Sequence, residues 1–172
     1  LCNRSLLCIG LDPDPALMAI EDVLTFNRAI IEATCDLVCA YKPNLGSYEG
    51  LGSKGLEALH RTLEFIPSHI PVIGDAKRGD VQPISRFYAQ ALFREWDFDA
   101  VTVNAYGGRD TVEPFLEYRD RGVFVWCRSS NPGARELQDL MVTPPYGGET
   151  RPFYEWVATA ALAWDDHGNV GL

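Results

Sequence analysis

The stretch PVIGDAKRGDV, at residues 71–81, decides how this sequence is interpreted. It opens with a short apolar run, Pro71–Gly74, and ends in a charged loop. Asp75 and Lys77 are two residues apart, so on an extended strand both side chains point to the same side. Asp80 follows in the loop. The pattern predicts a buried strand whose carboxyl end presents charged groups, although charges after a strand are also found as ordinary solvated loop residues.

Apolar runs like this one recur along the chain, and amphipathic stretches separate them. Most of the runs are continuous rather than alternating, as expected of strands that are covered on both faces. Their spacing is that of βαβ units. The runs are Leu6–Leu11, Leu37–Tyr41, Pro71–Gly74, Ala100–Val103, Gly122–Trp126 and Asn169–Leu172.

Apolar stripes with helical spacing predict helices between the runs. The clearest stripes are Val23, Phe26, Ile30 and Ala33; Leu56, Leu59, Leu63 and Ile66; and Ile84, Phe87, Tyr88, Ala91 and Leu92. Pro83 is well placed in the first turn of the third helix. The Pro and Gly content of Val142–Arg151 predicts a loop, and Trp156–Trp164 is expected to be a further helix.

Polar residues follow most of the apolar runs. They are Asp12, Lys42, Asp75 with Lys77, Asn104, and Arg128 with Ser129. Alternating strands and helices form either a doubly wound sheet or a barrel. In a barrel the carboxyl ends of all strands converge on one mouth, whereas a doubly wound sheet concentrates its site at one switch point. Five contributing strands therefore favour a barrel.

Composition narrows the function classes. The chain has 172 residues, 47% of them hydrophobic, and a net charge of -9. A folded single domain is expected, and the acidic balance argues against nucleic acid as a general partner. No apolar stretch is long enough to span a bilayer. The histidines, His60, His69 and His167, lack spaced ligand partners, so no metal site is expected.

The five cysteines are odd in number and form no CxxC pair. Cys8, Cys39 and Cys127 lie in or beside apolar runs, which suggests small buried hydrophobic residues rather than a disulfide framework. A reducing, cytoplasmic compartment is therefore expected.

Lys42 strengthens the functional interpretation of the strand at 71–81. It follows an apolar run directly and is itself followed by Pro43 and Asn44. Two lysines and two carboxylates near one barrel mouth would form a constellation of alternating charge. Such a site can hold a substrate anion and set a lysine to donate a proton.

Five motifs resemble those of orotidine 5'-monophosphate decarboxylase, in particular its bacterial branch with an SNPGA motif. They are LCIGLDPDP at 7–15, YKPNL at 41–45, DAKRGDV at 75–81, VTVNAYGGRD at 101–110 and CRSSNPGA at 127–134. The match runs from about residue 5 to residue 172. The resemblance implies an α/β fold: a (β/α)8 TIM barrel of the ribulose-phosphate-binding type, with about six βα units in residues 1–172.

The resemblance also implies roles for four charged residues. Asp12 would hold the ribose hydroxyls, and Lys42 would bind ribose and link the charged network. Asp75 would sit against the substrate carboxylate. Lys77 would protonate the carbon that loses carbon dioxide.

Further residues complete the implied site. Asp80 would reach into the neighbouring subunit's site, which makes the expected active unit a homodimer. Asn104 is expected at the substrate, and Ser129 or Ser130 would contact the pyrimidine ring. The resemblance implies no metal and no organic cofactor.

The sequence departs from the family's pattern in three places. It stops at Leu172, inside the expected sixth strand, before the family's glycine-rich phosphate site and its arginine. We therefore expect a barrel that is incomplete at the C-terminus and, because the chain does not begin with Met, at the N-terminus as well. We also expect that residues 1–172 alone are not a competent enzyme. Ile84 replaces a family threonine, with Ser85 one residue off, and the family's NPY reads Asn104-Ala105-Tyr106.

Two other function classes stay open at the level of sequence. One is a related sugar-phosphate decarboxylase or aldolase barrel, which would need a divalent metal. The other is a truncated, non-catalytic barrel that acts as an interaction module. The five charged residues expected at one mouth argue against the non-catalytic barrel, because burying charges that have no function there is energetically costly.

Overall fold

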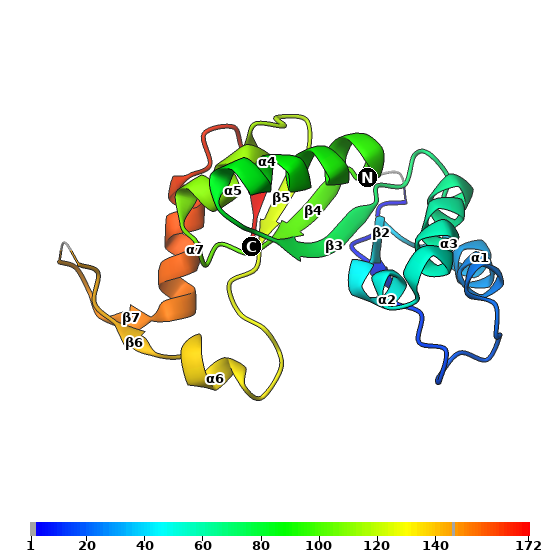
Figure 1. The fold of residues 1–172 in the computed structure, drawn as a ribbon, viewed down its shortest axis with the longest axis horizontal. Coiled ribbons are helices and arrows are strands. Elements are labelled where there is room, and N and C mark those ends of the chain that lie inside the picture. The colour runs from blue at the N-terminus through cyan, green and yellow to red at the C-terminus, as the bar shows by residue number, and fades with distance from the viewer. Residues whose placement is uncertain (1–2, 146) are drawn as a thin grey trace. The chain divides into compact units, whose positions relative to one another are not determined.

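The computed structural model describes residues 3–145 and 147–172 (Figure 1). These residues fall into two compact units. The first contains the described residues up to Ala76 together with Arg94–Val101, and the second contains Lys77–Phe93 together with Thr102–Leu172. The expectation of a single domain stays a prediction.

The first unit is built on short parallel strands. β1 (Cys8–Leu11) pairs in parallel with β2 (Ala40–Pro43). Residues before β3 (Ile73–Arg78) continue the pairing, because the Tyr41 N–H donates to the carbonyl of Pro71 at 3.1 Å. The helices of this unit are α1 (Val23–Thr34), α2 (Leu45–Glu49) and α3 (Gly52–Phe65), and α3 packs against both of the others.

A buried polar cluster lies under α1. The fully buried Asn27 donates from its side-chain amide to the hydroxyls of Tyr48 and Thr62, both at 3.0 Å. The Tyr48 hydroxyl donates to the carbonyl of Leu11 at the end of β1, and burial raises the pKa of this phenol. The expected apolar stripe of α1 is therefore wrong by one position: Asn27 and Ile31 are buried, because the amide nitrogen finds hydroxyl partners inside.

The second unit contains part of a parallel sheet with the order β3-β4-β5-β8. Its further strands are β4 (Ala100–Val103), β5 (Gly122–Val125) and β8 (Val170–Gly171). Its helices are α4 (Gln82–Gln90), which continues into a π-helical turn (Ala91–Glu95), α5 (Arg109–Leu116), α6 (Ala134–Leu137) and α7 (Phe153–Ala163). Helices α4 and α5 pack side by side against the sheet (Figure 1).

The six parallel strands lie at or beside the six predicted apolar runs, and two details differ. β2 continues to Pro43, so Lys42 lies within the strand rather than after it. The predicted loop Val142–Arg151 is closed at its base by the antiparallel strands β6 (Met141–Val142) and β7 (Arg151–Pro152). Strands of two residues are too short to show an alternating pattern, which is why the sequence did not reveal them.

The stripe predicted on α4 and the turn that follows it holds only in part, because Leu92 is buried and Tyr88 and Ala91 are half-buried. Ser85 and Ala89 are the buried residues of this helix, whereas Ile84 and Phe87 are 40% and 68% exposed. Pro83 does stand in the first turn, as expected. Ser85 can be buried because its hydroxyl is hydrogen-bonded to backbone groups.

The cysteines are less buried than their apolar neighbours suggested. Cys8 is exposed, and Cys39 and Cys127 are half-buried. The pleat of β1 explains Cys8, because Leu11 lies on the buried side of the strand and Cys8 lies on the other. All cysteines in the described part of the chain are free.

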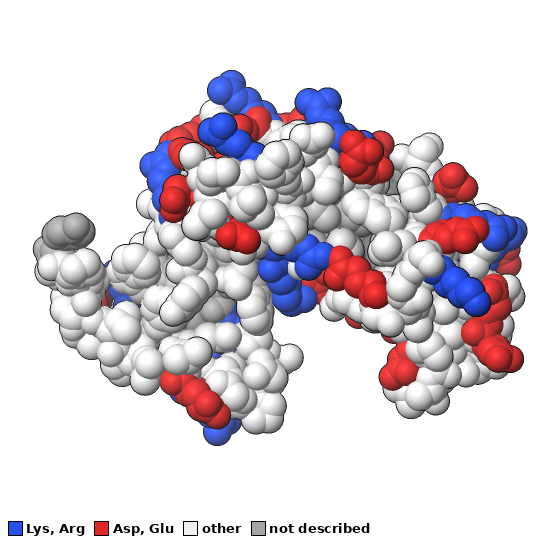
Figure 2. Space-filling model, viewed as in Figure 1, with Lys and Arg blue, Asp and Glu red and all other residues white. Residues whose placement is uncertain are grey.

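The surface mixes charges of both signs. Figure 2 shows Lys and Arg side chains interspersed with Asp and Glu on the face drawn. Within residues 3–145 and 147–172, no helix has the length and apolar character needed to cross a membrane.

Candidate active site

An ion pair forms the centre of the candidate site in the first unit. Lys42 Nζ lies 3.0 Å from Asp75 Oδ2. The Lys42 side chain is 33% exposed and that of Asp75 only 8%. The pair forms because β2 and the strand region of Asp75 are neighbours, with Asn44 opposite Asp75 in a parallel bridge. A carboxylate this buried needs bonded partners to stay charged.

Asn44 connects this ion pair to Asp12. Its side-chain amide donates to Asp75 Oδ2 at 3.3 Å, and its backbone N–H donates to Asp12 Oδ1 at 2.9 Å. Its own Oδ1 caps α2 by accepting from the Gly46 N–H. Sequence reasoning missed Asn44 as a site residue; the available signal was its position as an N-cap directly after a charged strand end.

Lys77 belongs to the second unit and has an unusual backbone. Its φ is +46°, in the left-handed region that residues other than glycine rarely adopt. Its N–H donates to Thr102 Oγ1 at 3.0 Å, and its side chain is exposed. Such strain is typical of residues held for a function. The expectation that Asp75 and Lys77 share one face of β3 stays a prediction.

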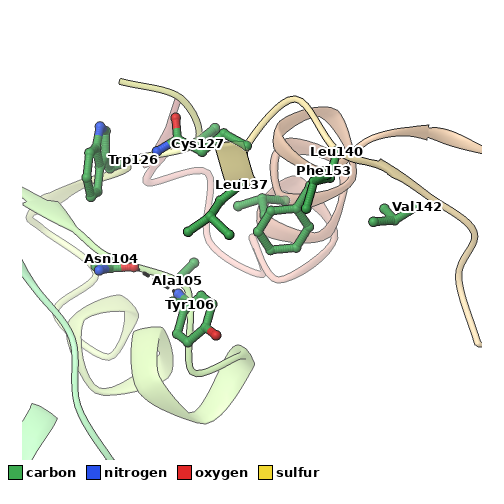
Figure 3. A pocket seen from close by; sticks show the side chains of 11 residues that line it. Asn104, Ala105, Tyr106, Trp126, Cys127, Leu137, Leu140, Val142 and Phe153 are labelled. Carbon is green, nitrogen blue, oxygen red and sulfur yellow. Dashed lines mark hydrogen bonds between the residues drawn. The ribbon is translucent and has the colours of Figure 1, made fainter. Parts of the chain in front are cut away.

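The loop after β3 approaches the end of β4 closely. A Cβ on Gly79 would lie 2.2 Å from the carbonyl oxygen of Asn104, so only glycine fits. The Asn104 N–H donates to the carbonyl of Arg78 at 2.7 Å. Asn104 Oδ1 accepts from the Tyr106 N–H, which fixes the side chain (Figure 3). Asn104 is thus rigidly placed at the end of β4.

Ser85 holds the backbone of Asp80 in this loop. Its hydroxyl accepts from the Asp80 N–H at 3.1 Å and donates to the Asp80 carbonyl at 2.9 Å. The Asp80 carboxylate accepts from the Val81 N–H and is exposed. The Ser85 hydroxyl is therefore used to bind the backbone of its own loop. Ser85 does not take the place of the family threonine that Ile84 replaces.

Ser85→Ala is expected to destabilise the protein by about 1–3 kcal/mol, because it leaves the N–H of Asp80 without its partner. Chemical denaturation would measure the loss. Thr25→Ala serves as a control, since it removes a hydroxyl that bonds only an exposed cap carboxylate, that of Asp22. If the Ser85→Ala variant were as stable as the unaltered protein, the claim that the Ser85 hydroxyl stabilises this loop would be contradicted.

The loop after β5 is held from two sides. Arg128 binds Asp139 with two hydrogen bonds of 2.8 and 3.0 Å, and this contact lowers the pKa of the Asp139 carboxyl. The Ser129 N–H donates to Gln138 Oε1 at 2.7 Å. Ser130 is exposed on the same loop. Of the two predicted serines, Ser129 is thus the one whose position is fixed by hydrogen bonds.

An apolar cavity of about 430 Å³ lies beside this loop in the second unit. It is lined by Asn104, Ala105, Tyr106, Trp126, Cys127, Leu137, Gln138, Leu140, Val142, Phe153 and Val157 (Figure 3). Apolar walls with a few oriented polar groups are typical of pockets for small ligands. Asn104 and Gln138 are the amides that could orient a ligand here.

The predicted site residues thus form separate clusters. Within the first unit, Asn44 brings together Asp12, Lys42 and Asp75. Within the second, Lys77 and Asn104 lie at the ends of β3 and β4, and Ser129 lies after β5. Across the described part of the chain, no three His, Cys, Asp or Glu side chains gather closely enough to hold a metal ion.

Comparison with known proteins identifies the family of the chain. The model of the orotidine 5'-phosphate decarboxylase / HUMPS family matches residues 5–170. The chain is 54% identical to the orotidine 5'-phosphate decarboxylase of Thermomicrobium roseum, covering 99% of the chain and 62% of that protein. It is 50% identical to the enzyme of the same name from Dehalococcoides mccartyi, covering 99% and 63%. The chain therefore spans less than two thirds of the length of these relatives.

Solved structures give the same result. The chain superimposes on Leishmania donovani OMP decarboxylase with a TM-score of 0.87 and 40% identity, covering 98% of the chain and 65% of that structure. For Leishmania donovani UMP synthase the TM-score is 0.88 at 40% identity, covering 99% and 37%. The predicted fold class, part of a (β/α)8 barrel, is confirmed. By the family match and these identities, the chain belongs to the orotidine 5'-phosphate decarboxylase / HUMPS family.

Proposed function

We propose that the protein converts orotidine 5'-monophosphate to uridine 5'-monophosphate in de novo pyrimidine synthesis. The observation that carries the proposal is the ion pair between Lys42 and the nearly buried Asp75, with Lys77 two residues further along the same strand. The identity to two decarboxylases over almost the whole chain supports the same substrate.

Lys77 is the proton donor in this proposal. Loss of carbon dioxide leaves negative charge on a carbon of the pyrimidine ring. An ammonium group placed at that carbon stabilises the charge as it develops and then protonates it as the general acid. The left-handed backbone of Lys77 supports the role, because strain of this kind persists where a side chain must be held in one direction.

Asp75 acts on the leaving carboxylate. A negative charge beside the substrate carboxylate opposes binding of the ground state and no longer does so once carbon dioxide departs, which is differential binding of the transition state. Lys42 and Asn44 both contact Asp75 Oδ2, and these contacts keep the carboxylate charged and in place. Asp12, fixed by the Asn44 N–H, holds the ribose hydroxyls.

The remaining residues orient the pyrimidine. Asn104 is fixed at the wall of an apolar cavity, and Ser129 is fixed on the loop after β5. Ser130 lies exposed next to it and offers a second hydroxyl. Donors and acceptors at the edge of an apolar wall suit a planar heterocycle.

The active unit is a homodimer in this proposal, with Asp80 contributed to the partner's site. Next to Asp80, the side chains of Val81, Ile84 and Phe87 are 63%, 40% and 68% exposed. Neighbouring exposed apolar side chains mark interaction surfaces. Phe87→Asp is expected to give a monomer with strongly reduced turnover, checked by sedimentation equilibrium. The exposed Tyr106→Phe variant should remain dimeric, and a Phe87→Asp protein that is still dimeric would contradict this interface.

The proposed reaction needs no metal and no organic cofactor, because the lysine supplies the positive charge. Dialysis against a chelator is therefore expected to leave turnover unchanged. Turnover is measured before and after treatment by the loss of the absorbance band of orotidine 5'-monophosphate. Activity lost on dialysis and restored by magnesium would favour a sugar-phosphate decarboxylase instead. Free Cys8, Cys35, Cys39 and Cys127 fit a reducing cytoplasm as the compartment.

The test of the proposed function uses the protein expressed from its complete coding sequence. Orotidine 5'-monophosphate is added, and the loss of its absorbance band is followed together with release of carbon dioxide. Turnover of this nucleotide, and none of sugar phosphates, is the expected result. A folded protein that leaves the nucleotide unchanged would contradict the proposal.

A further inference from the structure

We infer that Thr102 is a positioning residue that holds the backbone of Lys77 and thereby directs the Lys77 ammonium group for proton transfer. The inference rests on the proposed function and concerns the same site. Thr102 lies within β4, and its hydroxyl oxygen accepts a hydrogen bond from the Lys77 N–H at 3.0 Å. None of the roles that the family resemblance implies falls on Thr102, whose β-branched side chain is common in any strand.

The packing of β4 places the Thr102 hydroxyl outside the apolar core. Val101 and Val103 on either side of it are fully buried, whereas Thr102 is half-buried. Successive side chains of a strand point to opposite faces, so Thr102 lies on the face of β4 that also carries Asn104 at the end of the strand. The two valines therefore supply the apolar packing, and the contribution of Thr102 is a hydrogen bond.

β4 and the residue after it hold the chain on both sides of the Lys77 Cα. On one side, the Lys77 N–H is bound by the Thr102 hydroxyl. On the other, the carbonyl of Arg78 accepts from the Asn104 N–H at 2.7 Å. The second bond joins two main-chain groups and is present whatever the side chains are, whereas the first depends on the hydroxyl of Thr102.

The backbone of Lys77 needs such a hold because its φ is positive inside a strand. Among the described residues other than glycine, φ is positive at Arg4, Lys77 and Asp97, and both Arg4 and Asp97 lie outside the helices and strands. A φ of +46° is unfavourable for a residue with a Cβ and persists only where the surrounding structure holds it. The Thr102 hydroxyl contributes to this hold, because it binds the nitrogen of the N–Cα bond about which φ is measured.

The direction of the Lys77 side chain depends on this φ. Rotation about the N–Cα bond, with the N–H held in place, swings the Cβ and every atom beyond it. A return to the negative φ of an ordinary strand residue would therefore move the ammonium group. Proton donation requires hydrogen-bond reach, and a misplacement of about 1 Å can lower a rate about a hundredfold. Thr102 thus acts on the reaction through Lys77.

Thr102→Val tests the inference, because valine keeps the branched shape of the side chain and removes the hydroxyl. With orotidine 5'-monophosphate and the protein expressed from its complete coding sequence, kcat is expected to fall roughly tenfold to a hundredfold, while KM changes by less than about twofold. A merely structural role would reduce the amount of folded protein and leave the kcat of the folded fraction unchanged. Thr159→Val, which removes an exposed hydroxyl from α7, is the matched control and should keep a normal kcat.

Thr102→Ser and Thr102→Ala keep the test decisive if the valine variant folds poorly. Both lack the methyl group of threonine, and they differ from each other only in the hydroxyl. The serine variant is expected to have a kcat close to that of the unaltered protein, and the alanine variant to be as slow as the valine variant. Equal kcat in the serine and alanine variants, or a change confined to KM, would overturn the inference.

Amide hydrogen exchange at Lys77 tests the contact without substrate. Followed by NMR, exchange of the Lys77 N–H should be slow in the unaltered and serine proteins and about tenfold faster in the alanine protein, because the N–H has lost the hydroxyl that binds it. Equal exchange in the serine and alanine proteins would also overturn the inference. If exchange differs as expected and the unaltered protein leaves orotidine 5'-monophosphate unchanged, the proposed function is overturned and the contact between Thr102 and Lys77 stands.

Discussion

Lys77→Ala is expected to lower the turnover of orotidine 5'-monophosphate by several orders of magnitude while the protein stays folded. The physical reason is that the alanine variant lacks both the positive charge that stabilises the developing carbanion and the proton that the carbon receives. Single-turnover and steady-state rates, with circular dichroism for the fold, would check this. The matched control is Lys54→Ala, which removes an exposed lysine from α3.

The strained backbone at Lys77 allows a second variant that separates chemistry from folding. Lys77→Gly also lacks the amine, but glycine adopts a φ of +46° without strain. It is expected to be as inactive as Lys77→Ala and more stable than it by roughly 1 kcal/mol. Near-normal turnover in either variant would refute the assignment of the proton donor.

Asp75→Asn is expected to have the second-largest effect, again several orders of magnitude in turnover. Asparagine keeps the size of the side chain and can still contact Lys42 and Asn44, so the fold should be retained. It removes the charge that opposes the substrate carboxylate, so kcat should fall, while KM should fall or stay unchanged because the repulsion in the ground state is gone.

Steady-state kinetics on Asp75→Asn would show this split between kcat and KM. Asp36→Asn, which neutralises an exposed carboxylate in the same unit, is the control and should behave like the unaltered protein. An Asp75→Asn protein with unchanged kcat and a raised KM would mean that Asp75 only helps to bind the substrate.

The sequence predicted the strands and the charged strand ends well, because both depend on short-range patterns. In the described part of the chain, the strands β1, β2, β3, β4, β5 and β8 lie at or beside the continuous apolar runs. The sequence also predicted that Lys42 and Asp75 lie near one another, since neighbouring parallel strands align their carboxyl ends, although it did not specify the ion pair that the structure shows. These predictions needed only the identity of residues and their spacing.

The sequence failed where a polar side chain is buried by hydrogen-bond partners outside its own helix. Asn27 is buried because Tyr48 and Thr62 supply hydroxyls, and Ser85 is buried because the Asp80 backbone bonds it. An apolar stripe cannot anticipate such partners, so the most buried face of α1 lies one position away from the predicted stripe, and Ile84 and Phe87 on α4 are exposed although they were predicted to be buried.

The supporting amides of the site were missed for a related reason. Asn44 and Gln138 act on other residues of the site through hydrogen bonds whose geometry the sequence does not encode locally. Charged residues after a strand are easily recognised as candidate site residues in a sequence, whereas neutral amides are common on any protein surface. The hydrogen bonds in the structure were needed to find them.

The most direct test of the central claim is to run the reaction in D2O with the protein expressed from its complete coding sequence. The Lys77 ammonium exchanges its protons with solvent, so the account predicts uridine 5'-monophosphate with one deuterium on the carbon that lost carbon dioxide, detected by NMR. The Lys77→Ala protein should form almost no product. Labelled product formed equally fast by Lys77→Ala, or no product from the unaltered protein, would contradict the account.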